Sequence, residues 1–499
     1  MHKTKTLIIA AIITLASGIA AQAQSKDFKL GQWTEIHSSI IKELNRSYVD
    51  TLPVDKIFRA GIDAMLEGLD PYTVYIPEEE NEDLQMMLSK TYGGIGAIIH
   101  KKKEDNVIIN EPYFGSPAHK NGLQCGDEIL EIDGVPTKGL ETKESSDRMK
   151  GKPGTKVVFK VKKVRTGDTL DVPIIRERIH FPDIEYTGML DDTTGYILQS
   201  GFTEGVGQQV KDKFLKLKEQ GMKRFVLDLR GNGGGLMSEA VNIISLFVPK
   251  GSLAVSSKGL TEDTRREYKT STEPIDTKTP MIIMIDGGSA SASEIVSGGL
   301  QDLKRATIMG KTSFGKGLVQ SIRPLPYNGQ MKITTAKYYT PSGRCVQGIG
   351  VTPDVEIDVP TYSRLVYSLV LGGVIDQYVL RYARQHDSIP AVEDYHFSDA
   401  DFEDFIDFAK TQDFDYRSSA KATFDKMKKE LEEDGLAEVM SSELSALEKA
   451  LEMDKERFIR LKKDEIIPFI EEEIATRYHF QEAGVKIRLR YDKQLKAAL

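Results

Sequence analysis

The sequence predicts a multidomain α+β protein, in which an α/β layer follows a small β-rich domain and helical segments lie at both ends. Three observations support this fold class. The 499 residues exceed a single hydrophobic core, since one domain usually takes roughly 100 to 200 residues. Charged residues make up 28% and hydrophobic residues 40% of the chain, which is ordinary for folded domains. The spacing of apolar residues changes several times along the chain between helical and strand-like patterns.

The first residues have the pattern of an export signal. Lys3 and Lys5 precede an apolar run over residues 7–16, and an A-x-A cleavage site ends at Ala23. We therefore expect a signal peptide over residues 1–23 and an exported protein in the periplasm or cell envelope. A retained membrane anchor is the alternative, but the run is shorter than the roughly 20 apolar residues that cross a bilayer. We expect no stable membrane span.

Four further segments follow the signal. Residues 24–90 show helical spacing and end near a turn, so we expect a small helical domain there. Short β-rich runs separated by Gly and Pro predict a compact β domain over residues 91–172. Apolar strands alternate with helical stretches over residues 173–360, which predicts an α/β layer. Strands are expected at 97–100, 106–110, 129–132, 156–164, 225–229 and 281–285, and helices at 238–247 and 291–303.

The pattern of residues 361–499 predicts a charged helical extension. Leu444, Leu447 and Leu451 follow at positions i, i+3 and i+7, and Pro468 predicts a kink. The charged helices are typical of a solvated surface. Their apolar stripe could also pack against a second copy, so a homodimer through this extension is an open alternative.

Charge and cysteine content exclude several functions. A formal net charge of -8 without a basic cluster argues against nucleic acid as a partner. Cys125 and Cys345 are the only cysteines and fall in different predicted domains, so no disulfide framework is expected. No grouping of Cys and His has metal-ligand spacing, so we expect neither a metal nor a cofactor.

A serine-rich turn between a strand and a helix is the first candidate for chemistry. The buried strand over residues 281–285 leads through two glycines to Ser289, Ser291 and Ser293, where a helix opens. Unpaired N–H groups and the helix dipole at such a start favour developing negative charge. Serines at this position also cap helices, and capping is their more common role. The pattern alone does not choose among the three.

A serine nucleophile needs a base, and the usual histidine is missing here. None of the eight histidines lies within residues 181–385, which excludes a Ser-His-Asp triad unless another domain donates the imidazole. Lys316 lies between two glycines, where close backbone approach can shield an amine from water. A surface lysine in a glycine-rich loop is the simpler alternative.

Two sequence blocks in the β domain resemble a PDZ domain. The first is Tyr92-Gly93-Gly94-Ile95-Gly96, and the second runs from Gly115-Ser116-Pro117-Ala118 to Gly134. The resemblance implies that Gly93, Gly94, Ile95 and Gly96 form a peptide-binding loop. Glycines leave backbone N–H groups free for a carboxylate, and the following strand edge can accept an extended peptide as an added strand.

Three further blocks resemble the catalytic segments of the C-terminal processing (tail-specific) peptidases. They are Asp228-Leu229-Arg230-Gly231-Asn232-Gly233-Gly234-Gly235, Gly288-Ser289-Ala290-Ser291-Ala292-Ser293-Glu294, and Ser313-Phe314-Gly315-Lys316-Gly317-Leu318-Val319-Gln320. The order of the blocks and the preceding PDZ-like segment also match. The resemblance covers roughly residues 35–360 and implies an α/β protease core with a ClpP/crotonase-like layer and an inserted PDZ domain.

The resemblance also assigns roles to single residues. It implies that Ser291 is the nucleophile, that Lys316 is the general base and that Gln320 orients the lysine. The oxyanion hole would use the backbone N–H of Ala292 and one from Gly233 or Gly234. For Lys316 to act near neutral pH, burial must lower its pKa, so no carboxylate should pair with it. Arg230 and Asp302 match positions that matter in the family, and a structural pairing role explains each as well.

Two functions remain on the sequence alone. The first is an exported serine endopeptidase that recognises protein or peptide substrates by their free C-termini and cleaves by acyl transfer. The second is a non-catalytic PDZ scaffold that binds peptides with the same fold. The joint presence of Ser291, Lys316 and Gln320 favours the enzyme.

Overall fold

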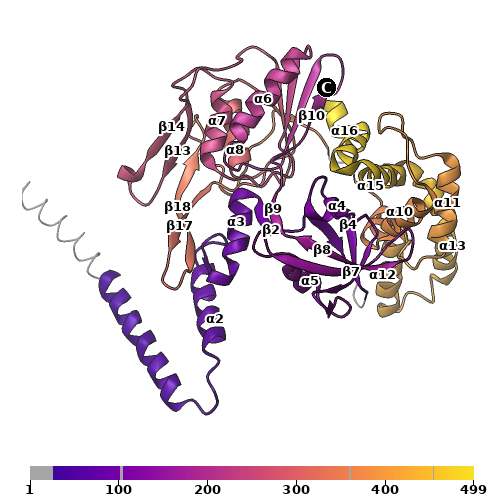
Figure 1. The fold of residues 1–499 in the computed structure, drawn as a ribbon, viewed down its shortest axis with the longest axis horizontal. Helices are drawn as coiled ribbons and strands as arrows, with labels where there is room; N and C mark the ends of the chain where they lie inside the picture. Colours follow the sequence, from indigo (N-terminus) through magenta and orange to yellow (C-terminus); the bar gives the residue numbers. More distant parts are fainter. Residues whose placement is uncertain (1–25, 102–104, 359–360, 453) are drawn as a thin grey trace, which may run out of the picture. The chain divides into compact units, whose positions relative to one another are not determined.

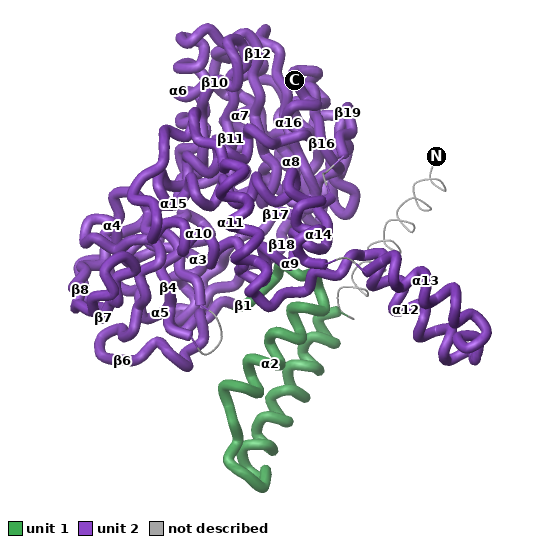
Figure 2. Tube along the Cα trace, turned by 90° about the vertical axis from the view of Figure 1, so that its right-hand side faces the viewer, with its two compact units in different colours: residues 1–75 green, residues 76–499 purple. Residues whose placement is uncertain are grey.

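The computed structural model describes residues 26–101, 105–358, 361–452 and 454–499. The chain divides into two compact units, residues 1–75 and residues 76–499, which Figure 2 colours separately. In the first unit, one helix covers residues 26–47 and α2 covers Val54–Glu67. The expected signal peptide lies outside the described residues. Within the described part of the chain, no helix is long and apolar enough to cross a membrane.

The second unit begins with helical turns and then forms the β domain. η1 (Glu78–Glu80) and α3 (Asn81–Ser89) precede β2 (Thr91–Gly94), which pairs with β9 (Glu177–His180) where the chain leaves the domain. The six-stranded sheet between them has the order β3-β4-β5-β7-β8, with short β6 (Val135–Pro136) paired to β5 off this path. Its elements are β3 (Ala97–His100), β4 (Val107–Pro112), α4 (Pro117–Lys120), β5 (Glu128–Ile132), α5 (Thr142–Met149), β7 (Lys156–Lys162) and β8 (Thr169–Ile175). Strand β3 therefore lies at an edge of this sheet.

A six-stranded sheet forms the centre of the α/β layer (Figure 1). Its order is β10-β11-β12-β15-β16-β19; β10 is antiparallel to β11, and the other pairs are parallel. The helices α6, α7 and α8 cover one face through a single apolar core. The bounds are β10 (Ile184–Met189), β11 (Thr194–Gln199), α6 (Val206–Glu219), β12 (Arg224–Asp228), α7 (Met237–Ser245), β15 (Met281–Ile285), α8 (Ala292–Asp302), β16 (Thr307–Gly310) and β19 (Val355–Glu356).

The alternation of side chains along β15 shows how both faces of this sheet are buried. Ile283 and Ile285 join the core under α6, α7 and α8. Ile282 and Met284 point to the opposite face, where they pack with Leu495 of the last helix. A parallel strand that is covered on both faces reads as a continuous apolar run, as β15 does.

A second sheet contains the strand that follows Lys316. β13 (Leu253–Lys258) pairs with β14 (Arg266–Lys269) and with β18 (Gln330–Tyr339), and β18 pairs with β17 (Leu318–Pro324). The 3-10 turn η2 (Glu262–Thr264) joins β13 to β14. β1 (Val74–Ile76) includes residue 75, at which the first unit ends in the sequence.

The remaining chain is helical, as expected. Its elements are α9 (Arg364–Leu371), α10 (Val374–Gln385), α11 (Asp399–Lys410), α12 (Ser419–Glu433), α13 (Ser441–Leu451), α14 (Lys455–Leu461), α15 (Lys463–Tyr491) and α16 (Lys493–Ala498). The kink expected at Pro468 is wrong: the non-helical backbone of α15 lies at Phe480, with φ 65° and ψ -178°. This break places the Phe480 ring 5.2 Å from that of Phe114 and 5.3 Å from that of His119, both in the β domain.

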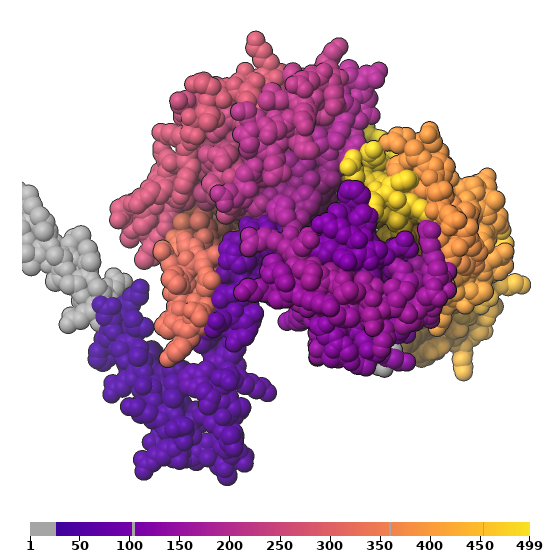
Figure 3. Space-filling model, viewed as in Figure 1, coloured from indigo at the N-terminus to yellow at the C-terminus, as the bar shows by residue number. Residues whose placement is uncertain are grey.

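The C-terminal helices and the β domain share a contact surface (Figure 3). Arg477 of α15 donates to Asn110 Oδ1 at 3.4 Å and also contacts the Cys125 sulfur. The Gln481 amide donates to the buried carboxylate of Glu111. The C-terminal helices thus contact both the β domain and, through α16, the central sheet.

Candidate active site

Ser291 lies at the junction between β15 and α8, where it is the N-cap residue of the helix. Its backbone has φ 57° and ψ -111°, a positive φ that a residue with a Cβ rarely adopts. Such a conformation costs about 1–3 kcal/mol and persists only where the surroundings enforce it. The structure therefore holds Ser291 in a strained position at a helix start, where unpaired N–H groups favour negative charge.

The other two serines of the triplet have structural roles. Ser289 and Ser293 are fully buried. The Ser289 hydroxyl donates to the carbonyl oxygen of Leu229 at 2.8 Å, and the Ser293 hydroxyl donates to that of Asn232 at 2.8 Å. Ser291, by contrast, is only half-buried. Among the three serines that the sequence left open, the structure favours Ser291 as the one that a substrate can reach.

The Glu294 carboxylate joins the serine segment to the lysine segment. It is fully buried and accepts four hydrogen bonds. One oxygen accepts from the backbone N–H of Ser291 at 2.7 Å and of Lys316 at 2.9 Å. The other accepts from the Ser313 hydroxyl at 2.6 Å and the Gly315 N–H at 2.7 Å. Because hydrogen bonds to a charged acceptor are strong, this carboxylate fixes the distance between the two backbones.

Tyr338 of β18 contacts the same two residues from their carbonyl side. Its hydroxyl lies 3.0 Å from the carbonyl oxygen of Ser291 and 2.7 Å from that of Lys316. The side chain is 1% exposed, and burial raises its pKa well above the ordinary tyrosine value, so the phenol keeps its proton as a donor. Glu294 therefore holds the Ser291 and Lys316 backbones at their N–H groups, and Tyr338 holds them at their carbonyl groups.

Lys316 lies in the loop between β16 and β17 and is partly buried. Burial lowers the pKa of its amine, and the positive charge of Lys332 lowers it further. The Glu294 carboxylate opposes these two effects, but the net direction is downward. This direction is the one that a lysine base requires, because only the neutral amine can accept a proton.

Gln320 lies on β17, four residues after Lys316. Its amide donates to the Thr334 hydroxyl at 3.3 Å on the neighbouring strand β18. The expected orientation of Lys316 by Gln320 stays a prediction.

The glycine run after β12 lies against the serine turn. A Cβ added to Gly234, which has φ 97°, would lie 2.8 Å from Ser291 Cβ and 2.9 Å from Ala292 N, so only glycine fits there. The Gly234 N–H donates to Asn232 Oδ1 at 2.9 Å. This bond favours Gly233 over Gly234 as the second donor to an oxyanion, together with Ala292 at the first position of α8.

The PDZ-like loop is shaped by close contacts. Gly96 has φ 72°, and a Cβ there would lie 2.5 Å from Ser116 Cβ. A Cβ on Gly93 would lie 2.1 Å from the carbonyl oxygen of Gly151. Between them, Gly94 ends β2 and Ile95 is buried in the core of the β domain. The loop leads directly into the edge strand β3, the geometry that strand addition by a peptide requires.

Sequence reasoning missed Glu294 and Tyr338. Glu294 could have been found, because Ser291 and Glu294 have the S-x-x-E spacing of a capping box. Tyr338 gives no such signal, since it lies 47 residues after Ser291 on a strand of another sheet. Asp302 has the structural pairing role: it contacts Arg344 and accepts from Ser342 N–H at 2.9 Å. Among the described residues, no His, Cys, Asp or Glu cluster could hold a metal ion.

Three family models match consecutive parts of the chain. They are a PDZ domain over residues 84–162, peptidase family S41 over residues 193–357, and the C-terminal helical domain of probable PDZ-proteases over residues 365–499. The second match contains all three glycine- and serine-rich blocks described above. The third covers α9 to α16.

Relatives match most of the chain. The carboxy-terminal-processing protease of Bartonella bacilliformis is 35% identical over 371 residues, which span 73% of this chain and 83% of that protein. A probable CtpA-like serine protease of Staphylococcus aureus strain COL is 34% identical over 366 residues, 72% of each chain. Among solved structures, the photosystem II D1 C-terminal processing protease is 28% identical, with a TM-score of 0.40, and covers 63% of this chain and 86% of its own.

Proposed function

Because this chain belongs to the C-terminal processing serine proteases of peptidase family S41 and carries a PDZ domain, we propose that it is an exported endopeptidase with Ser291 as nucleophile and Lys316 as general base. The substrates are proteins or peptides that the PDZ domain recognises by their free C-termini. The observation that carries this proposal is the Glu294 carboxylate, which accepts from the N–H groups of both proposed catalytic residues.

The proposed mechanism uses a neutral amine as the base and backbone N–H groups as donors to the oxyanion. The neutral Lys316 amine takes the hydroxyl proton of Ser291 as Oγ attacks the scissile carbonyl carbon. The N–H groups of Ala292 and Gly233 stabilise the oxyanion that forms. The resulting Lys316 ammonium gives its proton to the leaving amine, and an acyl-enzyme remains. Lys316 then takes a proton from the attacking water, and this proton returns to Ser291 Oγ when the acid product leaves.

Edge strand β3 and the loop before it support the proposed role of the PDZ domain. In the described sheet, β3 pairs with β4 only, so its other edge has backbone groups available for an added strand. An extended substrate tail would pair there and direct its carboxylate to the glycine-rich segment at residues 93–96, which spans the end of β2 and the turn into β3. Export is supported by the sequence of residues 1–23 alone.

The decisive experiment uses the chain from residue 24 and an unstructured peptide with a fluorophore pair across a cleavable segment. The peptide is made in two forms, one with a free C-terminal carboxylate and one with a C-terminal amide. Ser291→Ala and Lys316→Ala are compared with Ser419→Ala and Lys250→Ala, which change exposed residues outside the three glycine- and serine-rich blocks.

We expect the first two variants to lose cleavage by at least about 10³-fold, because removal of the nucleophile or its base leaves only the oxyanion hole and binding. The two control variants keep wild-type rates. The amide raises KM for the wild-type protein with a smaller effect on kcat. Wild-type activity in Ser291→Ala or Lys316→Ala would remove the proposed dyad, and equal KM for acid and amide would remove the proposed role of the PDZ domain.

A further inference from the structure

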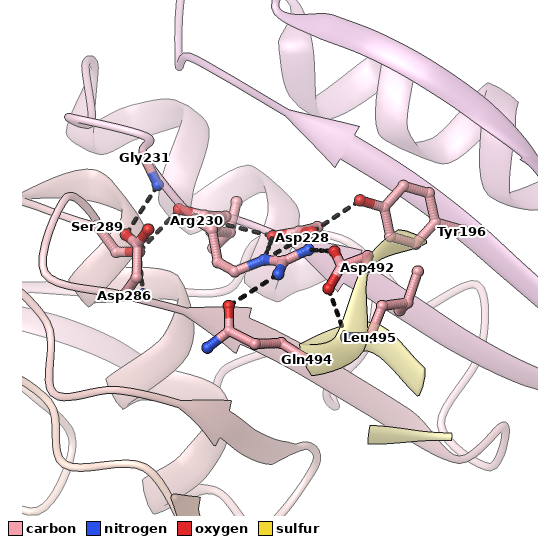
Figure 4. Close-up of polar contacts among 10 residues, drawn as sticks. Tyr196, Asp228, Arg230, Gly231, Asp286, Ser289, Asp492, Gln494 and Leu495 are labelled. Atoms are coloured by element: carbon pink, nitrogen blue, oxygen red, sulfur yellow. Dashed lines mark hydrogen bonds and ion pairs between the residues drawn. The ribbon is translucent and has the colours of Figure 1, made fainter. Parts of the chain in front are cut away.

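The last helix of the described chain reaches the catalytic core through one charged contact. Asp492 is the N-cap of α16, and its Oδ1 accepts from the Leu495 N–H at 2.8 Å. Its other oxygen, Oδ2, accepts from the Arg230 guanidinium at 2.5 Å. Figure 4 shows this carboxylate between α16 and the strand end that carries Asp228. Asp492 thus does two things at once, since one oxygen caps a helix and the other binds an arginine.

Arg230 is held on three sides. Its Nε donates to both oxygens of Asp228 at 3.0 Å, and its Nη1 donates to Gln494 Oε1 at 3.0 Å. The Asp228 carboxylate is 1% exposed and also accepts from the Tyr196 hydroxyl at 2.7 Å. A planar guanidinium that is paired in this way has little freedom to rotate. Asp492 and Gln494 bind the side of Arg230 that Asp228 leaves open.

Arg230 directly precedes the glycine run of the active site. The next N–H, that of Gly231, donates to Asp286 Oδ1 at 2.8 Å, and the same oxygen accepts from the Gly288 N–H at 2.9 Å in the serine turn. Asn232 O accepts from the Ala290 N–H at 3.0 Å. The position of Arg230 therefore sets where the glycine run begins, and these bonds align the run with the serine turn.

Helix α16 is anchored independently of this charge. Leu495 and Ala498 pack against Tyr196, Val226, Ile282 and Met284 on the face of the central sheet opposite α8. Gln494 Nε2 also donates to the carbonyl oxygen of Ile357 at 3.3 Å. The apolar contacts fix the helix on the sheet, so Asp492 and Gln494 meet Arg230 from a rigid support. A contact needed only for docking would not require a largely buried guanidinium, whose side chain is 17% exposed, directly before the glycine run.

We propose that Asp492 and Gln494 are positioning residues of the active site: they hold Arg230 so that the following glycine run presents its N–H donor to the oxyanion formed at Ser291. This inference rests on the proposed dyad and adds to it a part of the helical C-terminal domain. It assigns a catalytic contribution to a segment that lies more than 250 residues after Arg230 in the sequence.

The test separates the charge of Asp492 from its role as a helix cap. Asp492→Asn keeps a good N-cap residue but removes the negative charge from Arg230. Asp454→Asn is the matched control, because Asp454 caps α14 in the same way and its oxygen accepts from the Arg457 N–H. Each full-length variant is measured for kcat, KM, thermal unfolding and inhibition by a peptide aldehyde, whose hemiacetal with Ser291 carries an oxygen in the oxyanion hole.

We expect Asp492→Asn to lower kcat about tenfold with KM changed less than about twofold, as for an interaction made in the transition state. The aldehyde should bind about tenfold more weakly. Asp454→Asn should match the wild type in kcat, KM and aldehyde affinity. Asp492→Asn combined with Arg230→Lys should lose little more than Arg230→Lys alone, because both act on one contact.

Two results would overturn the inference. One is an unchanged kcat and aldehyde affinity in Asp492→Asn; the other is a loss of rate that only follows the unfolded fraction. Ser291→Ala is measured in the same series. If it is inactive and Asp492→Asn is not impaired, the inference alone fails; if Ser291→Ala cleaves normally, the proposed dyad and the inference fail together.

Discussion

The Glu294 carboxylate accepts a hydrogen bond of 2.9 Å from the backbone N–H of Lys316. A residue of α8 thus holds the loop that carries the proposed base, which lies between β16 and β17. The same oxygen accepts from Ser291 N–H. The geometry of the proposed dyad therefore depends on a carboxylate that need not touch the substrate.

We predict that Glu294→Gln impairs both stability and catalysis. An amide has one acceptor oxygen, so its NH₂ group would face N–H donors that now point at a carboxylate. Leaving a buried donor unsatisfied costs about 1–3 kcal/mol. We expect a lower unfolding temperature and a kcat reduced about 10- to 100-fold, since small displacements of catalytic groups have effects of this size. Glu267→Gln on exposed β14 is the control, and unchanged kcat in folded Glu294→Gln would contradict the role of this carboxylate.

Tyr338→Phe removes only the hydroxyl that contacts the Ser291 and Lys316 carbonyl oxygens. Loss of one buried hydrogen bond should lower the free energy of unfolding by about 1 kcal/mol. We expect kcat to fall about three- to tenfold, in line with a modest shift of the two backbones. The neighbouring Tyr339→Phe should leave both quantities unchanged. Equal steady-state rates for the two variants would show that Glu294 alone sets the geometry.

The lowered pKa of Lys316 predicts a pH profile. Activity requires the neutral amine, so kcat/KM should rise with pH on a limb centred below the ordinary lysine value of 10.5. The charge of Lys332 contributes to this lowering, and Lys332→Gln should therefore move the limb to higher pH without changing the plateau rate. A limb that stays in place would show that burial alone sets the pKa.

The same shift affects stability with a defined sign. Between the lowered pKa and 10.5, the unfolded chain binds more protons than the folded chain, so the free energy of unfolding rises with pH. Lys316→Met removes the buried charge. It should be more stable than the wild type at neutral pH, and the difference should shrink as the pH approaches 10.5. Urea unfolding at several pH values measures this, and a constant difference would contradict a buried, pKa-lowered amine.

Glu111 predicts a second pH dependence, at the contact with Gln481. Burial raises the pKa of Glu111 to about 7 from an ordinary value of 4.5. Between these values the folded chain holds a proton that the unfolded chain has lost, so stability falls as the pH rises from 4.5 to about 7. Glu111→Gln should flatten this slope. Part of it should remain, because burial also raises the pKa of nearby Glu473. Exposed Glu177→Gln should keep the wild-type slope. A Glu111→Gln profile identical to that of Glu177→Gln would contradict this account.

Local patterns predicted much of the fold. The strands Ala97–His100 and Met281–Ile285 have the expected ends, because each apolar run begins directly after a glycine or a proline and stops at polar residues. The break in α15 was expected at Pro468, but the non-helical residue is Phe480, whose ring contacts that of Phe114 in the β domain.

The candidate site likewise contains some residues that local patterns predict and others that they do not. Ser291, Lys316 and the glycine run could be found from sequence blocks, and Glu294 is visible in the capping-box spacing. Tyr338 and Asp492 could not be found, because each meets the site through contacts between segments far apart in the chain. Such pairings depend on the packing of the two sheets and α16, which no local pattern encodes.

The positive φ of Ser291 predicts an opposition between stability and activity. Glycine adopts such a backbone without penalty, so Ser291→Gly should unfold at a higher temperature than the wild type and should lose cleavage. Under the proposed mechanism, the hydroxyl at position 291 is the reason that a residue with a Cβ occupies a backbone better suited to glycine.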